Sequence, residues 1–277
     1  MNDKQCVRFR KISWVKPVAI MKRHILAITA IGCLIFTPFL SLGQVLVNDN
    51  FDGYSDQAAF LAAWPQVGAT VSGTLTSLQS DSAPNSINYA TTAQRNERSF
   101  AETGVATALN TITFSFDFYD ANSAASPYRQ YANLQDGASP SSGGQLISMG
   151  LNNNLTSPAD GGNFFMARIL GYNANAYFKL NTDPLLLRTT GWHNLAVTIS
   201  DQDFKFYVDG SLAETVPQTG LTLRSYDVVR LGSGLSSTTE AYFDNVLVQV
   251  NPVPEPTVAA LAGIGICALI GLRRSRN

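Results

Sequence analysis

The chain has 277 residues and a formal net charge of −1, but its basic residues are concentrated at the two ends. Between Gln44 and Val250 there are 9 Lys and Arg against 18 Asp and Glu, a net charge of −9, which argues against a nucleic-acid partner because phosphate binding needs clustered basic residues. The cysteines Cys6, Cys33 and Cys267 lie in the end segments, which excludes a disulfide, a thiolate metal site and a cysteine nucleophile from the body.

Residues 1–43 are predicted to be a secretory signal. The basic residues Lys22 and Arg23 precede an apolar run, and the small residues Ser41 and Gly43 occupy positions −3 and −1 of a cleavage site. The pattern predicts export through the inner membrane and cleavage by signal peptidase after Gly43.

The start of this signal leaves alternatives open. Met21 stands directly before the basic residues, so translation from Met21 and a long basic region from Met1 both fit the pattern. Lipidation at Cys33 is a third alternative, which is disfavoured because it would cut the apolar run short.

The body, residues 44–250, is predicted to be all-β. Short runs of alternating or apolar residues are separated by Gly, Asn, Asp, Ser and Pro, which is typical of a sandwich or barrel. A domain of this size buries about 70% of the surface of its unfolded chain, so it needs no metal or disulfide to fold. One short helix is expected at Gln57–Ala63, with Asp56 as its N-cap.

The clearest strand is Thr111–Tyr119, where apolar and polar side chains alternate. Its apolar face would consist of Ile112, Phe114, Phe116 and Phe118. Three antiparallel strands are then expected in succession at Trp192–Ser200, Phe204–Val208 and Ser211–Val216, the last two joined by a tight Asp209-Gly210 turn. Because Trp192 opens the first of them, we expect it to be a buried core anchor.

The segment Trp192–Val197, followed by Phe206–Gly210, resembles the LamG-like or concanavalin A-like sandwich family, in which a Trp-His strand start and a Tyr-Val-Asp-Gly hairpin mark adjacent strands. The segments Asn50–Gly53 and Phe243–Val246 also fit, because the first and last strands of that family lie side by side. The resemblance implies a two-sheet antiparallel jelly-roll sandwich over residues 44–250. It implies a fold and not a function.

No catalytic motif is recognisable in the body, so a non-enzymatic domain is predicted. Related sandwich hydrolases carry a Glu-x-Asp-x-x-Glu motif, which is absent here, and Asp117 and Asp120 would point to opposite faces of one strand. His193 is the only histidine after the signal segment. Its place in the Trp-His motif favours a packing residue over the base of a triad.

Two kinds of ligand site are predicted in the body. Asp52 and Asp244 are expected to meet where the first and last strands pair, and their hard oxygen atoms suit a structural Ca²⁺ ion; the alternative is that Asp52 belongs to a turn and Asp244 caps a loop. No cofactor is required. The candidate sugar contacts are Tyr119, Tyr128, Tyr131 and Tyr172, although half-buried tyrosines are also ordinary strand residues.

Residues 251–277 are predicted to be a sorting signal. Val253-Pro254-Glu255-Pro256 precedes an apolar stretch of 16 residues and a basic terminus that includes Arg273 and Arg274. As a helix this stretch would be about 24 Å long, against a hydrocarbon core of about 30 Å. The three parts resemble the PEP-CTERM sorting signal, which implies recognition by an exosortase and release or attachment at the cell surface. The alternative is an ordinary C-terminal anchor.

Together these features predict an exported cell-surface or extracellular-matrix protein whose sandwich binds polysaccharide without catalysis. Two alternatives remain: a glycan-active hydrolase or lyase with an unrecognised site, and a purely structural or adhesion protein.

Overall fold

In a computed structural model, residues Leu42–Glu255 form one compact unit. The structure describes residues 43–68, 70–90, 93–123, 129–137, 144–152, 164–170, 176–180, 186–218, 224–235 and 238–253. Within these ranges no helix has the length and apolar character needed to cross a membrane. The signal segment lies outside the described residues, as do Tyr128, Tyr172, Pro254, Glu255, Pro256, Arg273 and Arg274.

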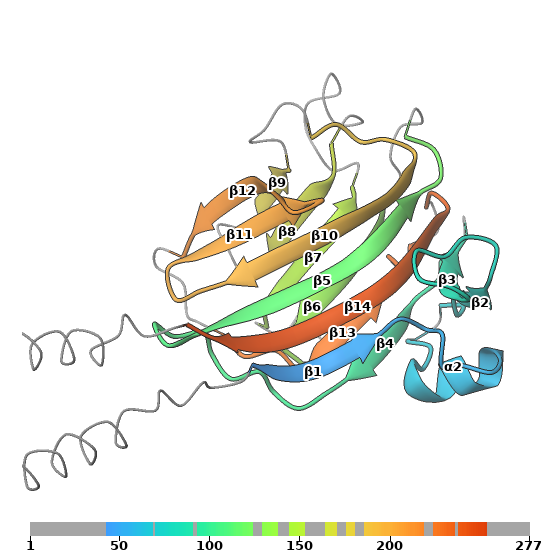
Figure 1. Cartoon of the computed structure of the whole chain (residues 1–277), viewed down its shortest axis with the longest axis horizontal. Helices are drawn as coiled ribbons and strands as arrows, with labels where there is room; N and C mark the ends of the chain where they lie inside the picture. The colour runs from blue at the N-terminus through green and yellow to red at the C-terminus, as the bar shows by residue number, and fades with distance from the viewer. Residues whose placement is uncertain are drawn as a thin grey trace, which may run out of the picture. The chain divides into compact units, whose positions relative to one another are not determined.

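The strands form two antiparallel sheets, one behind the other in Figure 1. The eight-stranded sheet, called the front sheet below, has the order β12 (Ser211–Pro217), β11 (Asp203–Val208), β10 (Gly191–Ile199), β5 (Asn110–Asp120), β14 (Ala241–Pro252), β3 (Ser86–Tyr89) and β2 (Thr74–Thr76), with β1 (Gln44–Asp49) beside β14. The six-stranded back sheet has the order β4 (Asn96–Ser99), β13 (Val228–Leu231), β6 (Gln130–Gln135), β7 (Leu146–Leu151), β8 (Met166–Leu170) and β9 (Ala176–Lys179). The all-β, two-sheet sandwich predicted from the sequence is confirmed.

The hydrophobic core lies between the two sheets. The expected apolar face of β5, from Ile112 to Phe118, is fully buried, and the back sheet contributes side chains such as Leu134 and Ile147. The rings of Phe118 and Phe165 meet edge to face at 6.0 Å. Because side chains alternate along a strand, every second residue of these strands is left for the outer faces of the sandwich.

The strand connections also agree with the sequence. Strands β10, β11 and β12 pair in succession, and β1 lies beside β14. Asp209 and Gly210 both have positive φ, at 51° and 76°, as a two-residue hairpin turn requires. The tight turn and the pairing of the first and last strands are therefore confirmed.

The one described helix, α2 (Gln57–Ala63), begins where expected, because Asp56 accepts a hydrogen bond from the Ala59 N–H at 2.9 Å. Trp64 follows the helix and is fully buried, and its indole Nε1–H donates to Asp49 Oδ2 at 2.9 Å. This contact fixes the end of α2 to strand β1.

The prediction that Trp192 is a buried core anchor is wrong. Its neighbour His193 and the alternate residues Leu195 and Val197 face the core, so the pleat turns Trp192 outward. The half-buried Trp192 ring packs against the ring of Tyr119 at 5.4 Å on the outer face of the front sheet.

Candidate functional site

The outer face of the back sheet carries a continuous row of polar side chains. Ala132 and Leu134 of β6 point into the core, so Tyr131, Asn133 and Gln135 occupy the opposite face. Strand register then aligns one residue from each strand, a set called the polar row below: Glu97, Arg230, Asn133, Ser148, Arg168 and Tyr177. Five strand spacings of about 4.8 Å make the row about 24 Å long.

Tyr131 lies beside the polar row, among basic groups. It is half-buried, and burial raises the pKa of Tyr131, while the positive charges of Arg95, Arg168 and Arg129 oppose that rise. The Arg168 guanidinium stands over the ring of Tyr177, 5.0 Å from its centroid. The three guanidinium groups and two aromatic rings therefore gather on one part of this face.

Two glycines make room for this cluster. A Cβ on Gly150, which has a φ of 141°, would lie 2.9 Å from the Cβ of Tyr131, so a side chain there would displace the tyrosine. A Cβ on Gly234 would lie 2.7 Å from the guanidinium of Arg95. The positions of Tyr131 and Arg95 thus depend on the absence of neighbouring side chains.

Several polar atoms of this face have no hydrogen-bond partner within the part of the chain that the structure describes. They are Arg95 Nε, Arg168 Nε, Asn133 Oδ1 and both polar side-chain atoms of Gln135. Asn133 and Gln135 are buried, whereas Tyr131 and Arg168 on the same face are partly exposed. Buried polar atoms without partners cost free energy and are uncommon in folded proteins, so their concentration on one face suggests a site kept for binding.

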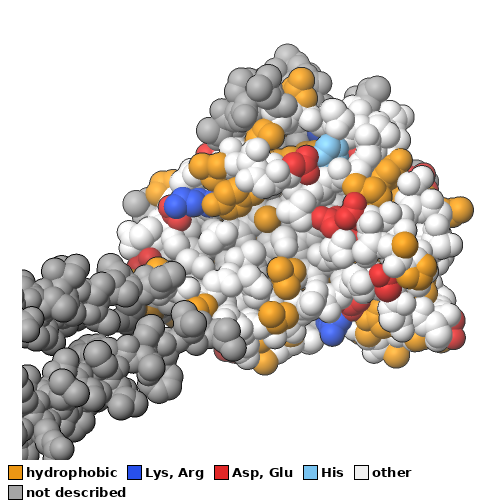
Figure 2. Space-filling model, viewed as in Figure 1, with side chains coloured by type: hydrophobic (Ala, Val, Ile, Leu, Met, Phe, Trp, Pro, Cys, Tyr) orange, Lys and Arg blue, Asp and Glu red, His pale blue; other side chains and the backbone are white. Residues whose placement is uncertain are grey.

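The charge of this face is opposite to that of the body. Apart from Arg98, which pairs with Asp49, its strands carry Arg230, Arg168 and Lys179 against the single carboxylate of Glu97. Arg230 Nε pairs with Glu97 Oε2 at 2.6 Å. In contrast, Figure 2, which looks onto the front sheet, shows mainly uncharged and acidic side chains with few basic ones.

Asp52 and Asp244, the predicted calcium ligands, contact the same loop. Asp244 accepts hydrogen bonds from the backbone N–H groups of Asp81 and Ser82, both at 3.0 Å, and Asp52 Oδ1 accepts one from the Asn85 N–H at 2.9 Å. Burial raises the pKa of Asp244 to about 6.

The two carboxylates therefore hold the loop in place by hydrogen bonds. A calcium ion would need these oxygen atoms as its ligands, but they accept hydrogen bonds from backbone N–H groups, so the arrangement does not fit calcium. Among the described residues no group of three or more His, Cys, Asp or Glu side chains is placed to hold a metal ion. Calcium binding stays a prediction from the sequence.

The two predicted sugar contacts that the structure describes, Tyr119 and Tyr131, lie on different sheets. Tyr131 lies on the back sheet, whereas Tyr119 lies on the outer face of the front sheet, between Trp192 and Tyr242, with its ring centroid 5.6 Å from that of Tyr242. Both of its contacts are edge to face, so the three rings do not form a flat platform. Tyr128 and Tyr172 lie outside the described residues.

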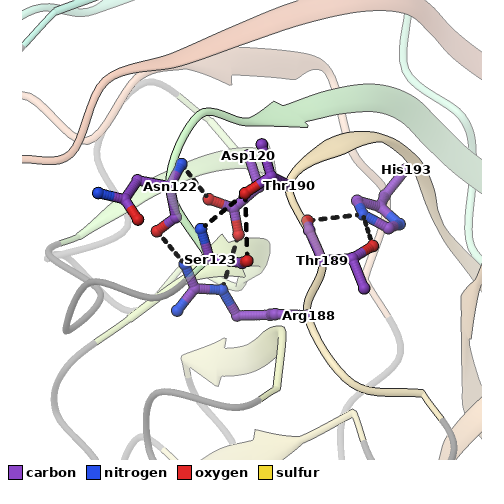
Figure 3. Close-up of polar contacts among 7 residues, drawn as sticks. All are labelled: Asp120, Asn122, Ser123, Arg188, Thr189, Thr190 and His193. Atoms are coloured by element: carbon purple, nitrogen blue, oxygen red, sulfur yellow. Dashed lines mark hydrogen bonds and ion pairs between the residues drawn. The ribbon is translucent and has the colours of Figure 1, made fainter.

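A second polar cluster lies where β5 ends and β10 begins (Figure 3). Arg188 Nε pairs with Asp120 Oδ2 at 2.8 Å, with both side chains fully buried. Ser123 and Thr190 hydrogen-bond across the same junction at 3.2 Å. These contacts fasten the segment before β10 to the end of β5.

His193 occupies the edge of this second cluster. Its Nδ1 lies 2.8 Å from Asp209 Oδ2, and its Nε2 lies 3.0 Å from the hydroxyl of Thr189 and 2.9 Å from the carbonyl oxygen of Thr189. The histidine therefore links the β11–β12 turn to the segment before β10. These contacts connect the Thr189 hydroxyl, the His193 imidazole and the Asp209 carboxylate in that order.

Residues 121–258 match the family model Laminin_G_3, described as the concanavalin A-like lectin/glucanases superfamily. This stretch is a concanavalin A-like lectin/glucanase domain. It contains most of the polar row, whereas Arg95 and Glu97 come from the chain before it.

The chain is similar to solved structures at low sequence identity. The carbohydrate esterase of the Shiga toxin-encoding bacteriophage phi24B has a TM-score of 0.50 at 13% identity, over 76% of this chain and 99% of that one. The cellulose-induced protein Cip1 has a TM-score of 0.48 at 14% identity, over 73% and 96%. The alginate lyase AlyC3 in complex with dimannuronate has a TM-score of 0.43 at 11% identity, over 61% and 75%. No curated protein matches this chain.

The concanavalin A-like resemblance did not point to the back sheet. Tyr131 was predicted from the sequence as a ligand contact, whereas Arg95, Gln135 and Arg168 were not. A signal was present in Gln130–Gln135, where tyrosine and amides alternate with Ala132 and Leu134. That period of two predicts a strand with one apolar and one polar face.

Proposed function

We propose that this protein is exported and binds polysaccharide without catalysis, through the outer face of the back sheet. The observation that carries the proposal is the cluster of Tyr131, Arg168 and Tyr177 on a face where several buried polar atoms have no hydrogen-bond partner in the described residues. Aromatic rings pack against sugar rings, and guanidinium groups donate several hydrogen bonds in fixed directions.

The geometry of a sheet suits an extended ligand. The polar row crosses all six strands of the back sheet and offers donors and acceptors at each strand spacing. A chain molecule lying along the row would reach its partly exposed members, Glu97, Arg168 and Tyr177, whereas Asn133, Ser148 and Arg230 are buried. The bacteriophage protein of similar fold is named a carbohydrate esterase. We propose a carbohydrate ligand for this chain as well.

The two ends supply the proposed location. Residues 1–43 would direct export and be removed by signal peptidase, and the marginal apolar helix would hold the precursor in the inner membrane. An exosortase-type enzyme would then act near Val253-Pro254-Glu255-Pro256. The product would reside at the cell surface or in the extracellular matrix.

A glycan-active hydrolase is the second candidate, and one observation favours it. The Thr189, His193 and Asp209 side chains form the hydrogen-bonded order of a nucleophile, a base and an orienting acid. Release of reducing sugar or of ester-linked acid by the wild type, but not by Thr189→Ala, would establish this activity. We expect neither product, because the contacts of His193 fit a structural link between two loops.

An array of neutral and acidic polysaccharides tests the binding proposal. The full chain, purified in a mild detergent, should bind at least one polysaccharide and leave its length and substituents unchanged. Absence of binding to every polysaccharide, together with capture of other surface proteins, would favour the structural or adhesion alternative.

A further inference from the structure

The basic groups on the back sheet point to one class of polysaccharide. Tyr131 lies within electrostatic reach of three arginines, Arg95, Arg129 and Arg168, in a body whose net charge is −9. Such a concentration of positive charge on one face of an acidic protein is not needed for solubility.

Arg168 is the best placed of these groups to meet a ligand. It is half-buried on the outer face, on the strand next to the β9 edge, between Ser148 of β7 and Tyr177 of β9. No ion pair links it to a carboxylate among the described residues, and its Nε has no hydrogen-bond partner there. Other arginines of the domain are paired: Arg230 with Glu97, Arg188 with Asp120 and Arg98 with Asp49.

We propose that the polysaccharide is acidic, and that Arg168, with Arg95 and Lys179 nearby on the same face, binds its carboxylate groups. This inference rests on the proposed function and gives it a ligand class. The planar guanidinium matches a carboxylate through two parallel N–H···O bonds. The Tyr177 ring under Arg168 holds the guanidinium in place.

The neighbouring groups support this assignment. Ser148 and Asn133 precede Arg168 along the polar row; both are buried and uncharged, so neither neutralises the guanidinium. The one carboxylate of the row, Glu97, lies at the far end, where Arg230 neutralises it. The part of the face around Arg168 therefore attracts anions, although the body as a whole repels them.

The test compares each acidic polysaccharide with its own neutral form. The full chain in mild detergent is titrated with polygalacturonate and with the same polymer after reduction of its carboxyl groups, and a second pair, dextran sulfate and dextran, separates carboxylate from sulfate recognition. We expect binding to polygalacturonate to be at least about tenfold tighter than binding to its reduced form. Affinity should fall as salt concentration rises.

Substitutions locate the contact. Arg168→Gln should weaken polygalacturonate binding at least about tenfold and abolish the preference for the acidic form, whereas Arg168→Lys should retain part of it. Lys205→Gln is the matched control, since Lys205 lies on the front sheet in a partly exposed pair with Asp203, and it should leave binding unchanged. Equal melting temperatures would show that the variants are folded.

The outcomes separate the two proposals. Equal affinity for acidic and neutral forms would overturn the acidic ligand and leave polysaccharide binding intact. An unchanged preference for the acidic form in a folded Arg168→Gln variant would overturn the assignment of Arg168 as the carboxylate contact. Preference for dextran sulfate over polygalacturonate would overturn the carboxylate assignment. Failure to bind any polysaccharide on the array would overturn the proposed function itself.

Discussion

Gln135, on the outer face of the back sheet, is predicted to lower the free energy of unfolding of the domain. It is fully buried, and neither polar atom of its side chain has a hydrogen-bond partner among the described residues. Its cross-strand neighbours, Val228 and Leu146, are apolar. A buried polar group without a partner costs about 1–3 kcal/mol, so Gln135→Leu, which keeps a similar volume, should raise the free energy of unfolding by about that amount.

The matched control is Gln130→Leu in the same strand. Gln130 is equally buried, but its Oε1 accepts a hydrogen bond from the Ser233 N–H at 3.0 Å and its Nε2 donates to the Thr239 carbonyl at 3.2 Å. Removing this amide leaves buried backbone groups unpaired and should lower the free energy of unfolding by about 1–3 kcal/mol.

Urea unfolding of the Leu42–Glu255 unit measures both variants, with unchanged m-values as the sign that the unfolded reference is the same. Opposite signs are expected. A loss of about 1 kcal/mol or more in both variants would show that the Gln135 amide is hydrogen-bonded in solution, and would remove one reason for regarding this face as a binding site.

Three further predictions concern other parts of the chain. Burial raises the pKa of Asp244 from 3.8 to about 6, so the folded state binds a proton more tightly than the unfolded state and stability should fall as pH rises between these values. The melting temperature should therefore be higher at pH 5 than at pH 7.5. A difference of the same size in Asp244→Asn would contradict the assignment to Asp244. Because N–H donors occupy the carboxylates of Asp52 and Asp244, chelation should leave the melting temperature unchanged; a decrease that Asp244→Asn abolishes would instead support a calcium site. Replacing Pro254, Glu255 and Pro256 by alanine should leave the precursor in the inner membrane, as fractionation would show, and normal surface delivery of a product of unchanged mass would refute the sorting role.

Much of the fold was predictable because its signals are local. The alternation in Thr111–Tyr119 defines the buried face of β5, and the Asp209-Gly210 pair defines a hairpin. Trp192 was misplaced because ring size was given more weight than the pleat, which puts His193 and Trp192 on opposite faces. Trp64, which follows a helix and carries no strand pattern, is the tryptophan that the core buries.

The candidate site was less predictable because it depends on pairing between distant segments. Arg168 and Asn133 meet through β7, and Glu97 meets Arg230 across 133 positions of sequence. Alternation within one strand identifies a polar face, but strand order and register decide which polar faces become neighbours. Neither follows from the sequence of any single strand.

The central claim is that the outer face of the back sheet binds polysaccharide, and two tyrosine variants test it most directly. Tyr177 stands on that face beneath Arg168, whereas Tyr207 is a half-buried tyrosine on the front sheet, opposite Ala196. Electrophoresis of the full chain through gels containing the best-bound polysaccharide of the array measures their affinities. Tyr177→Ala should abolish the retardation and Tyr207→Ala should preserve it, whereas the reverse result would place binding on the front sheet and contradict the account.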